Sequence, residues 1–135
     1  ALLSLAGGRQ GIRAAPVWKT KQMRNHHGGM VIDRDHLYGC DEALLTCLDL
    51  ATGRVMWQHR SVGKGSVVWA DGKLVVRSED GPVALVEATP RGYVELGRFT
   101  PEHTSDRPAW PHPVIADGKL WLRDQERMDV YSIAE

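Results

Sequence analysis

The sequence predicts an all-β protein made of four-stranded antiparallel blades, about three of them, forming part of a larger six- to eight-bladed β-propeller. One apolar hairpin pattern occurs three times, with Leu37, Leu74 and Leu120 at the same place in each copy. The leucines are 37 and then 46 residues apart, and these spacings bracket the length of one propeller blade. Apolar residues alternate or cluster in fours without a 3.6-residue period, so no helix is expected.

Each copy predicts two short strands joined by a tight turn. An Asp-Gly pair lies between the two apolar runs in the second and third copies, and it favours a hairpin because Gly accepts positive φ. The first copy has Arg34-Asp35 there, and Asp tolerates the left-handed region better than most residues. The three copies are residues 28–40, 65–77 and 111–123.

Further apolar runs predict the outer strands of each blade. Third strands are expected at 44–50, 83–87 and 128–133, and fourth strands at 55–59 and 94–99. Near the start of the sequence, 2–5 and 12–19 resemble a third and a fourth strand, with Trp18 matching Trp57. We therefore expect the end of a preceding blade at 1–20, blades at 21–60 and 61–100, and a blade without its outer strand at 101–135.

Composition narrows the class of partner. Seventeen Lys and Arg balance seventeen Asp and Glu, which argues against nucleic acid or an anionic membrane as the main partner. No apolar run approaches the roughly 18 residues that a membrane span needs. Cys40 and Cys47 flank a short turn, and both a disulfide and a buried free thiol at Cys47 remain open.

Polar and aromatic residues gather where the three inner strands begin, which in a propeller lies near the central axis, where ligands usually bind. In the alignment His27, Lys64 and Trp110 share one position, and Gly29, Ser66 and His112 follow two residues later on the same face. These positions predict either a ligand-binding wall or the lining of a water-filled channel. The candidate residues are Asn25, His26, His27, Lys64, Ser66, Trp110 and His112.

Other chemistry finds little support in the sequence. His26 and His27 are adjacent, so on a strand they point to opposite faces and cannot easily hold one metal ion. Gly63-Lys64-Gly65-Ser66 lacks the spacing of a phosphate-binding loop, and no Gly-x-Ser-x-Gly elbow occurs. We therefore expect no metal site, and no catalytic residue can be named. Arg77 and Arg123 match in the alignment, which indicates either a shared contact with a neighbouring blade or two solvated side chains.

The turn Leu48-Asp-Leu-Ala-Thr-Gly-Arg-Val-Met-Trp57 resembles the turn motif of pyrroloquinoline-quinone-like (PQQ-like) repeats. Residues 25–29, 63–66, 110–114 and 120–123 are also similar to bacterial PQQ-like propeller repeat proteins. Relatives of this shape include quinoprotein alcohol dehydrogenases and scaffolding lipoproteins of outer-membrane assembly. The resemblance implies a periplasmic or extracellular location. It also implies that Glu135 lies near a C-terminus, with the missing outer strand supplied by an N-terminal part of the full protein.

The resemblance is weakest where catalysis would need it. Quinoprotein dehydrogenases carry a vicinal cysteine pair over the quinone and hold calcium with Asp or Glu and Asn, and this sequence has no Cys-Cys. PQQ with calcium is therefore expected only by family resemblance, since fold does not imply function. The sequence favours a non-catalytic scaffold or interaction module that binds other blades, further copies of the chain, or a protein or small molecule. The alternatives are part of a quinone-dependent oxidoreductase and a carbohydrate-binding propeller that stacks sugars on Trp110.

Overall fold

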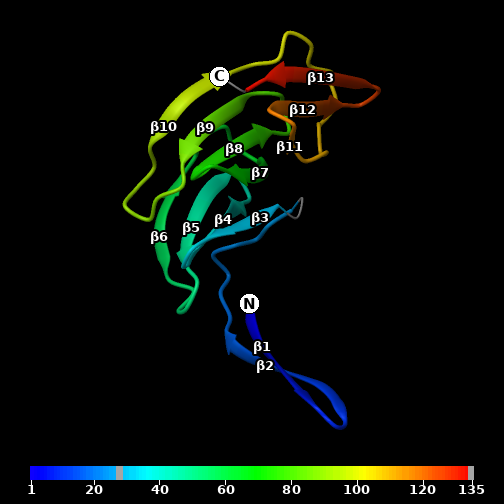
Figure 1. Cartoon of the computed structure of the whole chain (residues 1–135). Helices are drawn as coiled ribbons and strands as arrows, with labels where there is room; N and C mark the ends of the chain where they lie inside the picture. Colours follow the sequence, from blue (N-terminus) through cyan, green and yellow to red (C-terminus); the bar gives the residue numbers. More distant parts are fainter. Residues whose placement is uncertain (27–28, 134–135) are drawn as a thin grey trace.

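The computed structural model describes residues 1–26 and 29–133, and these residues form thirteen strands in four antiparallel sheets (Figure 1). No helix is present among them, and so none that could cross a membrane. The all-β prediction is confirmed. The strands are β1 (Leu2–Gly8), β2 (Gly11–Trp18), β3 (Met30–Asp33), β4 (His36–Asp41), β5 (Leu44–Asp49), β6 (Val55–His59), β7 (Gly65–Ala70), β8 (Lys73–Ser78), β9 (Val83–Glu87), β10 (Glu95–Phe99), β11 (Val114–Ala116), β12 (Lys119–Asp124) and β13 (Arg127–Ser132).

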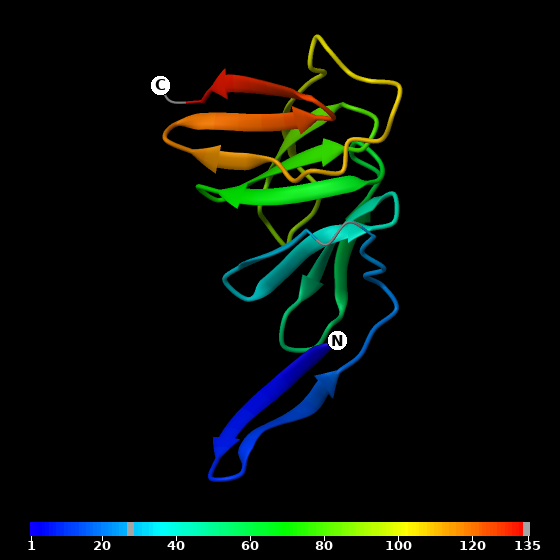
Figure 2. The ribbon, with the colours of Figure 1, turned by 90° about the vertical axis from the view of Figure 1, so that its right-hand side faces the viewer.

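Three of the sheets stack side by side as successive blades (Figures 1 and 2). The first blade is β3-β4-β5-β6, the second is β7-β8-β9-β10, and the third is β11-β12-β13. Each blade begins with the predicted hairpin, whose turn residues Arg34, Asp71 and Asp117 all have positive φ near 50°. Strands β1 and β2 pair only with each other and project away from the stack.

The pairs β5–β6, β9–β10 and β1–β2 each contain a β-bulge at the same position. In the first blade the bulge follows the pair Cys47–Trp57, and in the second it follows the pair Leu85–Gly97. The hairpin of β1 and β2 has the same bulge next to the pair Leu2–Trp18. Since one bulge shifts pairing by one residue, β1 and β2 pair in the same way as the third and fourth strands of the blades. That they are the end of a preceding blade stays a prediction.

The core lies between neighbouring blades. Between the first and second blades, the buried residues include Tyr38, Cys47, Val67 and Leu74. Between the second and third blades, Val75 and Val83 pack on Leu120 and Leu122. Apolar side chains are thus removed from water by stacking one sheet on the next, so each blade depends on its neighbour.

Two open questions from the sequence are answered by this packing. Cys40 pairs with Leu45 and Cys47 pairs with Tyr38, so the two cysteines are not opposite each other, and both are buried free thiols. Arg77 is buried and its Nη1 donates to the carbonyl oxygen of Arg123 in the next blade, at 2.5 Å. Arg123 itself is exposed. The matching arginines therefore play different parts, one joining two blades and one facing solvent.

Candidate functional site

A carboxylate between the second and third blades joins two of the predicted site residues. Lys64 lies just before β7, and its Nζ is 3.3 Å from Oε2 of Glu79, which follows β8. Trp110, in the segment before β11, donates its indole Nε1–H to the same oxygen at 3.2 Å. One oxygen atom of Glu79 thus receives a cation from one blade and an aromatic N–H from the segment that leads into the next.

The backbone of Glu79 reinforces this junction. Its N–H donates to the carbonyl of Lys64 at 2.9 Å, and its carbonyl accepts from the N–H of Ala109 at 2.8 Å. The segment that carries Trp110 is therefore fixed to the second blade by main-chain and side-chain bonds together. The Trp110 side chain nevertheless stays 60% exposed, so its ring is held in position and presented to solvent.

A second contact brings the first and third blades together over the start of β7. A Cβ atom added to Gly29 would lie 2.9 Å from Cε1 of His112 and 3.2 Å from the backbone nitrogen of Val67. The imidazole of His112 therefore lies directly against Gly29, and any larger side chain there would displace it. The segments that lead into β3 and β11 therefore meet beside β7.

The other predicted residues take different places. Asn25 donates from Nδ2 to the carbonyl of Gly29 at 3.1 Å, which shapes the segment before β3. His26 lies with Nε2 3.9 Å from Oε1 of Glu42. Ser66 is buried at 3% exposure and is not part of an open wall. His27 lies outside the described residues. Whether any of these residues binds a ligand stays a prediction.

Glu79 is the candidate-site residue that the sequence analysis missed. It follows Leu74 by five residues, just as Glu42 follows Leu37 and Gln125 follows Leu120. Each of these three side chains contacts a segment that leads into an inner strand, in its own blade or in the next. Glu42 faces His26, Glu79 bonds to Lys64 and Trp110, and Gln125 donates to the carbonyl of Pro108. Extending the repeat alignment past the second strand would have found this position.

The side chains around Glu79 can be compared with what a metal ion or a quinone would need. Over residues 1–26 and 29–133, no three His, Cys, Asp or Glu side chains meet closely enough to hold a metal ion. A quinone site with calcium would need a cysteine pair over the ring and a carboxylate free to coordinate. Cys40 and Cys47 are buried between blades, and Glu79 is already bonded to Lys64 and Trp110. These residues do not fit that cofactor.

Comparison with solved structures assigns the fold. The chain is similar to BamB from Moraxella catarrhalis, a β-propeller, with a TM-score of 0.62 and 15% identity, over 77% of this chain and 32% of that one. The chain has a β-propeller fold. It is also similar to the computationally designed Ika8 protein, with a TM-score of 0.57 and 14% identity, over 78% of this chain and 32% of the other. The chain thus spans about a third of the length of each. No protein-family profile and no curated protein sequence matches it.

Proposed function

We propose that this chain is part of a PQQ-like β-propeller that serves as a non-catalytic interaction module, with the Trp110 ring as its binding platform. The observation that carries the proposal is the bond from Trp110 Nε1 to Glu79, which fixes a ring that is 60% exposed. Binding surfaces use Trp in this way, because its large ring contributes contact area and its N–H can be satisfied inside the protein. Fixing the ring in advance also lowers the entropy lost on binding.

Lys64 sets the chemistry that this platform favours. The Lys64 side chain is 29% exposed and its ammonium group lies beside the carboxylate of Glu79, whose side chain is only 17% exposed. A partner that approaches Trp110 therefore meets an aromatic face next to a partly available cation. An extended protein segment with an apolar residue and a neighbouring acidic residue fits both groups. We place the module outside the cytoplasm, on the sequence resemblance to PQQ-like proteins.

A selection from a random peptide library on the immobilised chain tests this function. Selected peptides should lose most of their affinity for Trp110→Ala, because a central aromatic contact carries much of the binding energy. They should keep it for Trp69→Ala, a control that removes a Trp that is 40% exposed on β7. Peptides that bind both variants equally well would place the binding surface elsewhere. Cofactor absorbance retained by the purified chain after adding PQQ and calcium would overturn the non-catalytic assignment.

Carbohydrate binding is the second candidate, and the same exposed ring favours it. A pyranose can stack its apolar face on an indole ring, and Lys64 could donate a hydrogen bond to a hydroxyl. Titration with neutral oligosaccharides, followed by Trp fluorescence, separates the two functions. A saturable change that is absent in Trp110→Ala but present in Trp69→Ala would support sugar binding over peptide binding.

A further inference from the structure

The hairpin of β1 and β2 is longer than its counterparts in the blades. Counted from the shared bulge, the pair Ser4–Ala15 is equivalent to Asp49–Arg54 and Glu87–Val94, the last bonded pairs before the turns of the two blades. Ten residues lie between the first pair, four between the second and six between the third. Residues 5–14, which we call the arm, therefore extend beyond the rim at which the other blades turn, and Figures 1 and 2 show them projecting from the molecule.

The arm presents aliphatic side chains without covering them. Leu5 pairs with Ala14 and Gly7 pairs with Ile12, and alternate pairs share one face of a two-stranded ribbon. Leu5 is 68% and Ile12 is 78% exposed, the two highest values among the large apolar residues described. Both side chains lie on the same face of the ribbon, and their exposure to water is unfavourable because apolar surface is stabilised by burial.

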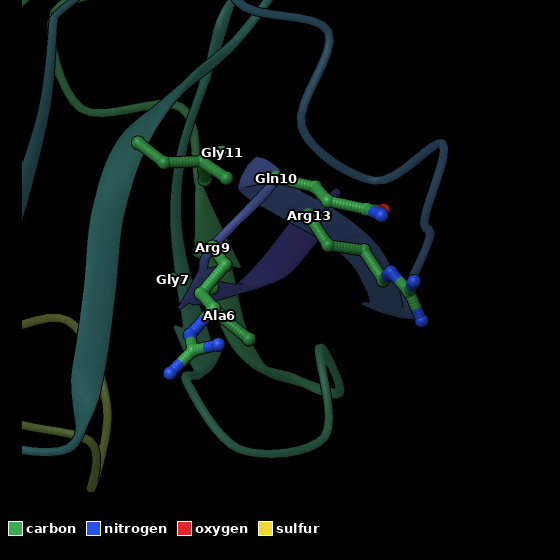
Figure 3. Close-up of a pocket in the computed structure, with 8 residues that line it drawn as sticks. Ala6, Gly7, Arg9, Gln10, Gly11 and Arg13 are labelled. Carbon is green, nitrogen blue, oxygen red and sulfur yellow. The ribbon is translucent and has the colours of Figure 1, made fainter.

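Two arginines flank these aliphatic side chains. Arg9 is in the turn and Arg13 pairs with Ala6 on the opposite face. Figure 3 shows the hollow lined by residues 6–13, with Arg13 and Gln10 extended on one side of the ribbon and Arg9 pointing in another direction. Long Arg side chains can reach phosphate groups beside a surface that the apolar face enters.

The charge of the chain is strongly divided between its two ends. Residues 1–32 contain five Lys and Arg and no Asp or Glu, so the remaining residues carry twelve basic against seventeen acidic side chains. The third blade, which carries Asp124, Glu126 and Asp129, lies at the far end of the molecule from the arm in Figure 1. An anionic surface would therefore attract the arm and repel the rest, which orients the molecule arm first.

We propose that the arm docks on the surface of a phospholipid bilayer that contains anionic lipids. Leu5 and Ile12 enter the boundary between headgroups and acyl chains, and Arg9 and Arg13 contact lipid phosphates. A second arm is a poorer occupant because the two would bring like charges together. A projecting ribbon that exposes Leu5 and Ile12 on one face suits a soft surface better than it suits the groove of an acidic protein, which the experiment includes as a competing outcome.

Vesicle sedimentation with the full chain tests the proposal. The chain should bind vesicles of phosphatidylcholine mixed with phosphatidylglycerol, fail to bind phosphatidylcholine alone, and bind less as salt is raised. Removing both charges with Arg9→Gln and Arg13→Gln should weaken binding roughly 10- to 30-fold, given about fivefold for each basic residue near such a surface. Leu5→Ser with Ile12→Ser should weaken it by a similar factor. An Ile12→Trp variant should show a blue-shifted emission only with the anionic vesicles.

Matched controls keep the test specific. Arg91→Gln and Leu96→Ser change an arginine and a leucine that are exposed on the second blade, and they should leave vesicle binding unchanged. The arm variants should melt like the parent, since residues 5–14 are exposed. Absence of binding to the anionic vesicles, equal binding to neutral ones, or equal losses in the control variants would each overturn the proposal. Binding to polyglutamate, lost in the arm variants, without vesicle binding would assign the arm to an acidic polypeptide instead.

Discussion

The indole Nε1–H of Trp57 in β6 donates to the backbone carbonyl of Thr89, 32 residues later in the next blade, at 2.7 Å. Trp18 in β2 makes the equivalent bond to the carbonyl of Leu50, also 32 residues later, at 2.9 Å. Trp18 additionally lies over Gly53, where a Cβ atom would be 2.6 Å from its ring. A fourth-strand tryptophan thus ties each of these two units to the turn of the blade that follows.

Replacing Trp57 should weaken the junction between the first and second blades. The ring is partly buried and contacts Tyr38 in its own blade and Tyr93 in the next. We expect Trp57→Ala to lower the free energy of unfolding by about 3 kcal/mol, the lower end of the range for Trp→Ala in cores. Urea unfolding followed by circular dichroism measures this, with Trp69→Ala as the exposed counterpart. A loss below about 1 kcal/mol would mean that the ring contributes little to the junction.

Gly65 occupies a position that admits no side chain. A Cβ atom there would lie 1.8 Å from the carbonyl oxygen of Arg77 on the paired strand. Gly65→Ala should therefore force β7 and β8 apart and destabilise the chain by about 3 kcal/mol or more. Gly97→Ala is the matched control, because a Cβ atom at Gly97 meets nothing within 4 Å. Equal melting temperatures for the two variants would contradict the close approach at Gly65.

The two thiols should react slowly in the folded chain. Burial raises the pKa of Cys40 and of Cys47 to about 11, so little of the reactive thiolate exists near neutral pH. We expect iodoacetamide to label them on the order of 100-fold more slowly in buffer than in urea, where their pKa returns to about 8.5. Mass spectrometry counts the labels. Fast labelling of the folded chain, or no labelling of the unfolded chain without a reductant, would contradict two buried free thiols.

Glu95 should contribute stability that acid removes. Hydrogen bonds from Arg98 and from Tyr93 lower the pKa of Glu95 to about 2, below the value of about 4.3 in an unfolded chain. Its contribution is therefore present above about pH 4.3 and lost as the pH falls toward 2. Since the pair with Arg98 is partly exposed, the gain is at most about 1 kcal/mol. Melting temperatures of the parent and Glu95→Gln should differ at neutral pH and converge in acid, whereas the exposed Glu126→Gln should match the parent throughout.

The strands and their turns were predictable from the sequence because local chemistry determines them. The Asp-Gly turns at Asp71 and Asp117 and the apolar runs beside them need no distant partner to be recognised. The fourth strand expected at 94–99 begins at Glu95, and the third strand expected at 128–133 runs from Arg127 to Ser132, so the differences are confined to the strand ends.

The contacts between blades were predictable only in part. The sequence indicated that Trp57 packs on a neighbouring blade. Its hydrogen-bond partner, the carbonyl of Thr89, could not be predicted because every residue type has a backbone carbonyl. Glu79 was missed because the alignment stopped at the second strand. The charge balance of the whole chain also concealed a basic end and an acidic end, since an average over 135 residues says nothing about where the charges lie.

The chain made as these 135 residues alone should self-associate. The outer edge of β13 pairs with no other described strand, and an open edge recruits further strands. Val114, Trp121 and Val130 pair across the third blade in one row, where Val114 and Val130 are 53% and 45% exposed. In a propeller this row would pack on the next blade, and left open it favours contact with other copies.

We expect sedimentation at low micromolar concentration to show a dimer or larger species. Val130→Lys should shift it toward monomer by placing a charge in this row, whereas Leu96→Lys on β10 should not. A compact parent monomer with a cooperative melt would show that this edge and this row do not drive association.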